Sequence, residues 1–238
     1  LNGTYQHTFS SKSAGKPDST AKPDMMNGMP AIHLLKAQVD YQHRIVDETT
    51  TNELRNLSDE LIGGNKNIED GPSSSYRINI DYTLPLRGAD KFEAGMQWRS
   101  GKSEDNTELW IYNDQTGELE MIDEYSNNID YSRNIYAAYI LYAGYFGDFG
   151  YQAGFRTEYT DRKIEMLDAD PFTINRWDYF PTLHLSYNLP AEQQVMISYS
   201  RRINRPRGYW LEPFITWEDA YNVRKGNPEL IPEYIDSY

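Results

Sequence analysis

The chain has 238 residues and a formal net charge of −13, with 36 acidic side chains against 23 basic ones. This balance argues against general nucleic-acid binding, and the absence of cysteine excludes a disulfide scaffold, a thiolate zinc site and a cysteine nucleophile. The mean hydropathy is −0.76, and the longest apolar stretch, residues 135–147, is shorter than the about 20 residues of a membrane-spanning helix.

The first third of the chain contains a loop, a strand and one helical pattern. Residues 11–30 are rich in Pro, Ser and Lys and are typical of a loop, whereas residues 32–46 are typical of a strand. Residues 49–64 place three leucines at helical spacing, begin with a capping-box pattern and end in Gly63–Gly64. We expect a short helix here within a long loop, which leaves the strand at 32–46 without an obvious partner.

The remainder of the chain repeats a period of two, with apolar and polar residues in strict alternation. The pattern covers residues 76–84, 92–98, 149–159, 183–189 and 195–199. Such a period puts one set of side chains on each face of a strand. One face carries aromatic and aliphatic residues, and the other carries the charges Arg77, Asp81, Glu93, Arg99, Arg156 and Glu158. These segments predict an antiparallel all-β fold.

The connections between these strands differ in length in a regular way. Short turns at 84–92, 146–149 and 189–194 alternate with long segments at about 100–132, 160–178 and 203–232. An ordinary sheet with one solvated face explains the alternation of residues but not this alternation of lengths. A transmembrane β-barrel explains both, with short periplasmic turns and long extracellular loops. We therefore predict strands that cross the outer membrane and contact its lipid.

The last of these strands ends in an arginine-rich segment, "SYSRRINRP", residues 198–206. Pro206 cannot donate to a ladder and marks the end of the strand. Arg202 falls on the polar face, whereas Arg201 has the parity of Tyr199 and must lie at or beyond the rim. These arginines could meet carboxylates of another domain, lipid phosphates or an anionic ligand. The candidates for facing the lumen or a plug domain are Arg202, Arg205, Arg156 and Glu158.

The long segment after these arginines is unusually rich in aromatic residues. Its candidates for ligand contact are Tyr209, Trp210, Trp217 and Tyr221, accompanied by Phe214. The alternative is that these rings pack the loop onto its neighbours. Further along, Gly226 is expected to supply a positive φ before the next strand begins.

No catalytic or metal-binding pattern accompanies these features. The four histidines, His7, His33, His43 and His184, are scattered without ligand spacing, and no hydrolase or phosphate-loop motif is present. We therefore expect no enzyme activity, no catalytic residue, no bound metal and no cofactor.

Three blocks in order, "SYSRRINRP", "PF" and "GNPELIPEYIDSY", resemble the mid-barrel signature of TonB-dependent outer-membrane receptors. The resemblance is close over about residues 195–238 and loose over 1–75. It implies a barrel of about 22 strands around an N-terminal plug domain, with uptake driven by the TonB complex. This chain has no recognisable plug, so residues 1–238 are expected to form about eight to ten strands of one larger barrel domain.

The function that this resemblance implies is active uptake of a nutrient such as a siderophore, haem, an oligosaccharide or a peptide. The plug domain, the TonB complex, the nutrient and a surface lipoprotein are then the candidate partners. Two alternatives stay open: a passive porin-type channel, and a soluble or surface-exposed β-rich module that binds glycans through its Tyr and Trp residues.

Overall fold

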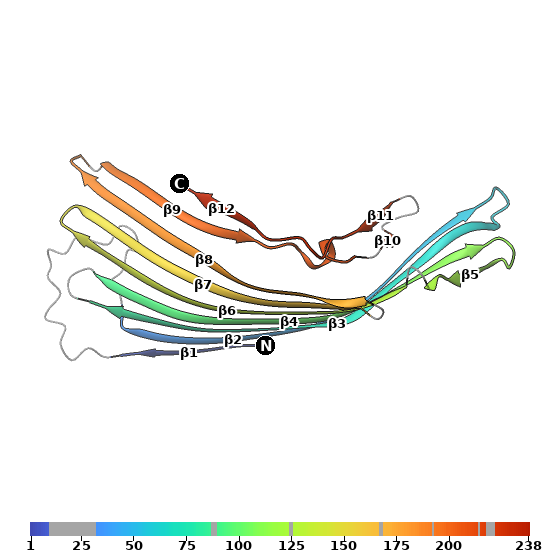
Figure 1. Cartoon of the computed structure of the whole chain (residues 1–238), viewed down its shortest axis with the longest axis horizontal. Coiled ribbons are helices and arrows are strands. Elements are labelled where there is room, and N and C mark those ends of the chain that lie inside the picture. Colours follow the sequence, from blue (N-terminus) through green and yellow to red (C-terminus); the bar gives the residue numbers. More distant parts are fainter. Residues whose placement is uncertain are drawn as a thin grey trace.

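The computed structural model describes residues 1–9, 32–86, 90–123, 126–166, 169–191, 193–213, 215–217 and 222–238. Most of the described strands form one large antiparallel sheet in the order β1-β2-β3-β4-β6-β7-β8-β9-β12 (Figure 1). Its strands are β1 (Asn2–Thr8), β2 (Leu34–Arg55), β3 (Leu61–Pro85), β4 (Lys91–Asn113), β6 (Asn127–Phe146), β7 (Phe149–Met166), β8 (Ala169–Leu189), β9 (Gln193–Asn204) and β12 (Glu233–Ser237). The short strand β5 (Glu118–Met121) adds to β4, and β10 (Ile215–Trp217) and β11 (Val223–Lys225) pair separately.

The register of the sheet puts all the predicted apolar positions on one face. Ile78, Trp98, Tyr136, Tyr159 and Trp177 are paired in succession from β3 to β8 and form one continuous row. Side chains on this face remain exposed although they are apolar, as at Trp177, which is 57% exposed. A contiguous apolar surface of this kind requires an apolar surrounding such as lipid. The predicted alternation and all-β fold are therefore confirmed.

The opposite face is polar and concave. Neighbouring strands lie about 4.8 Å apart, yet side chains two strands apart touch on this face. Arg99 on β4 reaches Glu158 on β7 at 3.2 Å, and the Tyr139 hydroxyl on β6 donates to Asp81 on β3 at 2.8 Å. Gly95 lies beneath the Tyr139 ring, where a Cβ atom would clash. The sheet therefore curves around this polar face (Figure 1).

The short turns are staggered, as the tilted strands of a barrel wall require. Lys91, at the β3–β4 turn, lies in the same row as Ala143 of β6 and His184 of β8. From this row β6 continues three residues to Phe146, and β8 continues five residues to Leu189. Each successive turn thus lies further along the strand direction, which is the shear of a barrel. The described sheet is open, with β1 and β12 at its edges.

The prediction of a helix at residues 49–64 is wrong. Strand β2 continues to Arg55, a tight turn follows, and β3 starts at Leu61. The Asn56 side chain accepts hydrogen bonds from the backbone N–H groups of Ser58 and Glu60 at 2.9 and 3.0 Å. This local turn satisfies the backbone without a helix, and the leucines have no surface to pack against, as Leu57 is fully exposed. The β-branched run before the turn favours a strand.

Two of the expected long loops are hairpins instead. Within 100–132, β4 extends to Asn113 and β6 begins at Asn127, and within 160–178 only the short connection between Met166 and Ala169 interrupts the strands. The ladder continues beyond the apolar row, although the strict alternation of apolar and polar residues fades there. Sequence periodicity therefore underestimates the length of these strands.

The strand at 32–46 finds its partners in β1 and β3. Thr8 pairs with Leu34, so the chain leaves β1 and enters β2 at the end of the sheet where the short turns lie. One long connection therefore belongs to that end, contrary to the expectation that only short turns do. The loop expected at 11–30 lies outside the described residues.

Candidate functional site

After β9 the chain turns back over the concave face. Residues 205–213, called here the inner segment, include the short 3₁₀ helix η2 (Gly208–Trp210). Leu211 is 1% exposed and packs against Ile129 of β6 and Ile164 of β7. A buried leucine of this kind anchors a segment by removing apolar surface from water. The inner segment is therefore packed against the barrel wall.

Residues 222–230 hold the inner segment from the other side. The N–H groups of Gly226 and Asn227 donate to the carbonyl oxygens of Glu212 and Trp210, both at 2.7 Å. A Cβ atom at position 226 would lie 2.6 Å from each of these oxygens. Gly226 is not among the described residues with positive φ, so that expectation is wrong. The glycine is needed because two backbone segments approach closely.

A charged network lies on the concave face below the inner segment. Glu158 of β7 is bound by Arg205 and Arg156 at 2.7 Å and by Arg99 at 3.2 Å. The Glu158 side chain is 5% exposed. Three guanidinium groups from β4, β7 and the end of β9 therefore converge on one buried carboxylate.

The network continues to a second buried carboxylate on the neighbouring strand β8. Asp178, whose side chain is fully buried, pairs with Arg176 at 2.9 Å and with Arg205 at 3.3 Å. The Tyr234 hydroxyl of β12 donates to it at 2.5 Å. The four arginines exceed the two carboxylates, and the buried Nε atoms of Arg99 and Arg205 have no partner. The network is therefore a cationic region in an acidic chain.

Arg205 and Tyr234 also bridge a gap between strands. The β8–β9 ladder covers Thr182 to Leu189 of β8, so residues 169–181 of β8 have no ladder to β9. From Ser200 to Asn204, β9 pairs with β12, which lies on the side of β9 away from β8. Side chains that meet at Asp178 thus join the two parts of the wall where backbone hydrogen bonds do not.

The structure brings together three of the four residues predicted to face the lumen, namely Arg156, Glu158 and Arg205. Arg202 is exposed, and within the described part of the chain its guanidinium donates only to the Ser237 hydroxyl, at 3.4 Å. Arg201 has the parity of Tyr199, as predicted, and binds Asp236 of β12 at 2.8 Å.

The predicted aromatic contacts are partly described. Tyr209 and Trp210 lie on η2, where the Arg224 guanidinium lies 5.0 Å from the centre of the Tyr209 ring. Trp210 is 46% exposed. Trp217 belongs to β10, and Phe214 and Tyr221 lie outside the described residues.

The candidates chosen from the sequence omitted four members of the network. These are Arg99, Arg176, Asp178 and Tyr234. The sequence pattern could have indicated two of them, because Arg176 and Asp178 alternate with Trp177 and Tyr179 in the same way as Arg156 and Glu158 alternate with Phe155 and Thr157. Tyr234 lies on a strand distant in sequence, and only the fold places it here.

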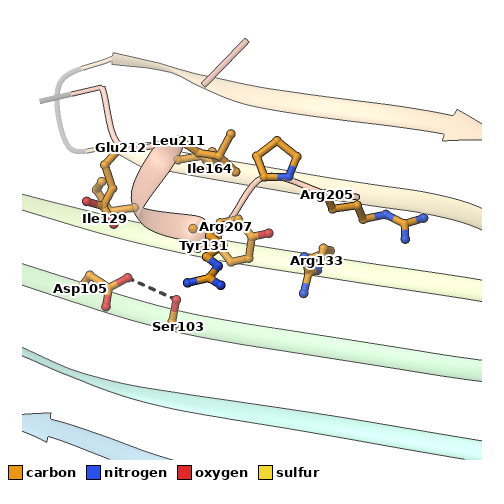
Figure 2. A pocket seen from close by; sticks show the side chains of 12 residues that line it. Ser103, Asp105, Ile129, Tyr131, Arg133, Ile164, Arg205, Arg207, Leu211 and Glu212 are labelled. Carbon is orange, nitrogen blue, oxygen red and sulfur yellow. Dashed lines mark hydrogen bonds between the residues drawn. The ribbon is translucent and has the colours of Figure 1, made fainter. Parts of the chain in front are cut away.

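A cavity of about 390 Å³ lies between the inner segment and the sheet (Figure 2). Asp105 of β4 and Glu212 line one part of it, and Arg133 and Arg207 also line it. Burial raises the pKa of Asp105, although a hydrogen bond from Ser103 opposes this effect. Burial likewise raises the pKa of Glu212 against the attraction of Arg224.

Among the described residues, no group of three or more His, Asp or Glu side chains is arranged to hold a metal ion. No helix in the described part of the chain is long and apolar enough to span a membrane.

A curved antiparallel sheet with staggered turns, an apolar outer face and a charged concave face defines the wall of an outer-membrane β-barrel. Comparison with known families agrees, since residues 31–238 match the model of the outer membrane protein beta-barrel family. The chain belongs to this family and is located in the cell outer membrane. Comparisons with curated proteins and with solved structures found no match.

Proposed function

We propose that this chain is barrel wall from a TonB-dependent receptor that imports a nutrient actively. The observation that carries the proposal is the inner segment, which runs from the end of β9 back over the concave face and is anchored there by Leu211. A segment anchored inside the lumen narrows the water-filled passage on which a passive porin depends. The resemblance of residues 195–238 to the receptor signature supports the same function.

The charged network supports a second domain in the lumen. Its four arginines are balanced by only two carboxylates among the described residues. Buried cations without matching anions are costly. Carboxylates of an N-terminal plug domain would supply the missing partners. In this proposal the plug, the TonB complex and a surface lipoprotein are partners, and the chain catalyses no reaction.

The passive channel is the second candidate function, and energy dependence separates it from active uptake. Cells that express the full-length protein are grown on limiting siderophore-bound iron, haem, oligosaccharides or peptides, and compared with cells that lack it. We expect growth on one of these nutrients to require both the protein and an intact TonB complex. Growth that requires the protein but persists without TonB would contradict active uptake.

A control must show that the barrel is present in both strains. Outer-membrane fractions are analysed on gels with and without boiling, since folded barrels migrate differently from unfolded ones. Equal amounts of the heat-modifiable band with and without TonB would assign a growth defect to transport rather than to assembly.

A further inference from the structure

The cavity beneath the inner segment has charges of opposite sign in different parts (Figure 2). Figure 2 shows Asp105 and Glu212 at one end, and Arg133 and Arg205 towards the other. Its volume of about 390 Å³ falls within the roughly 300–1,000 Å³ of small-molecule sites.

The cationic part has unused binding capacity. Within the described residues, neither the Arg133 nor the Arg207 guanidinium group makes a hydrogen bond or ion pair, and the Arg133 guanidinium lies 6.0 Å from the centre of the Tyr131 ring. Arg205, in contrast, is already bound to Glu158 and Asp178. Guanidinium groups bind carboxylates through paired, charge-assisted hydrogen bonds. Arg133 and Arg207 are therefore available to a carboxylate.

The acidic part also has unused capacity. Asp105 accepts one side-chain hydrogen bond, from Ser103 at 3.3 Å, and Glu212 pairs with Arg224 at 3.2 Å. Burial disfavours the charged form of both carboxyl groups. A cationic group between them would offset this cost.

Part of the cavity wall is apolar. Ile129, Ile164 and Leu211 line the cavity together with the charged residues. A ligand that fits this lining needs a cationic group, an anionic group and an apolar part.

We propose that this cavity binds a zwitterionic ligand of the short-peptide class. Its ammonium group lies between Asp105 and Glu212, its carboxylate binds Arg133 and Arg207, and its apolar side chain lies against the apolar part of the cavity wall. This inference rests on the proposed function, because it names the substrate class of the receptor.

The first test uses the full-length protein purified in detergent and isothermal titration calorimetry. The probes are the dipeptide alanyl-leucine, N-acetyl-alanyl-leucine, which lacks the ammonium group, and alanyl-leucinamide, which lacks the carboxylate. We expect alanyl-leucine to bind at least about tenfold more tightly than either relative, since each lost ion pair in a desolvated site costs about 1.4 kcal/mol or more. Equal affinities, or no binding at about 10 mM, would overturn the proposal.

The second test assigns each ligand charge to its residues. Asp105→Asn is expected to weaken alanyl-leucine without weakening N-acetyl-alanyl-leucine, and Arg133→Gln to weaken alanyl-leucine without weakening alanyl-leucinamide. The matched controls are Glu104→Gln, next to Asp105 on the other face of β4, and Arg44→Gln on β2, both outside the cavity. Losses in the controls as large as in the test variants would contradict the assignment.

These measurements are independent of energy supply. If the protein binds alanyl-leucine with the expected selectivity but its uptake does not require TonB, active transport is rejected and the peptide site is kept. TonB-dependent uptake of another nutrient, with no selectivity for alanyl-leucine, would reject the peptide site and keep the receptor.

Discussion

Glu158 is the residue on which most of the charged network depends. It neutralises Arg99, Arg156 and Arg205, and its replacement by glutamine leaves these three cations close together and largely buried. We expect Glu158→Gln to destabilise the folded barrel by about 3–5 kcal/mol, the usual effect of removing one partner of a buried ion pair. The measurement is the temperature at which the full-length protein loses its folded band on a gel.

The same strand offers a control for this prediction. Glu165 of β7 pairs with Lys163, but both side chains are more than 40% exposed. Exposed pairs contribute at most about 1 kcal/mol, so Glu165→Gln is expected to change the transition little. If the two variants lose their folded band at the same temperature, the network stabilises the barrel no more than an exposed ion pair does.

The packing of the inner segment against the barrel wall is expected to depend on pH through Glu212. Because burial raises the pKa of Glu212, its protonation favours the packed segment over a detached one. This contribution is complete below the ordinary pKa of about 4.3 and is lost as the pH rises through the raised value. We expect hydrogen-exchange protection of the Gly226 and Asn227 amides to fall as the pH rises through this range.

The variant Glu212→Gln should flatten this pH profile. Asp105, whose pKa is raised in the same direction, accounts for any remaining slope. Glu229→Gln changes an exposed carboxylate in the adjoining segment and should leave the profile as it was. An unchanged slope in Glu212→Gln would show that another group controls the segment.

For single residues, the sequence predicts the face of the strand on which a side chain lies better than it predicts which residues that side chain contacts. Alternation places Arg156 and Glu158 on the polar face, and the structure agrees. Alternation cannot place Arg205, because the period ends at Pro206, nor can it bring Tyr234 to Asp178 from 56 residues away. Those contacts depend on how far the sheet curves and on where the inner segment folds.

Among the elements, the inner segment depends on the close approach at Gly226. In Gly226→Ala the new methyl group would lie 2.6 Å from two carbonyl oxygens, so the backbone must separate, at a cost of about 1–3 kcal/mol. We expect faster tryptic cleavage after the exposed Arg207 in the folded full-length protein.

Gly208→Ala, in the inner segment itself, is the matched control. A Cβ atom at position 208 meets nothing within 4 Å. Its cleavage rate should equal that of the unchanged protein. Equal cleavage of both variants would mean that the Gly226 contact does not hold the inner segment.

The element missed by the sequence analysis has a simple physical explanation. Leucines at helical spacing in residues 49–64 predict a helix only if a surface exists to bury them. Strands β2 and β3 pair with each other up to their turn, and β3 also pairs with β4 as far as Asn65, so this segment lies in the sheet and offers no such surface. Cross-strand pairing, which continues from Leu34 to Arg55, decides the local structure instead.

For the molecule as a whole, neighbouring residues of β2 provide a test of which face meets lipid. Val39 lies on the apolar face opposite Ile78, and Gln38 lies on the concave face opposite Asn79. We expect Val39→Arg to destabilise the barrel by about 2–4 kcal/mol, the cost of a cation at the bilayer midplane. Gln38→Arg should have a small effect, because Asp40 lies two residues away on the same face.

Outer-membrane yield and the heat-modifiable band of the full-length protein measure both variants. A larger loss in Gln38→Arg than in Val39→Arg would reverse the assignment of the two faces.

The class of the molecule was predictable from its sequence, and its dimensions were not. The alternation of apolar and polar residues and the short turns at 84–92, 146–149 and 189–194 predict a barrel wall, because the face of the sheet that contacts lipid must be apolar. The number of strands in a closed barrel depends on pairing at the free edges of β1 and β12, which the local pattern does not encode.

The hairpin of β2 and β3 has a consequence for the cell. At about 3.3 Å per residue, the eleven residues from Ile45 to Arg55 form some 35 Å of strand that leads to its tip. Its apolar side chains Ile45, Leu54 and Leu57 are largely exposed there. A particle that approaches the cell from outside would meet this tip before it reaches the concave face.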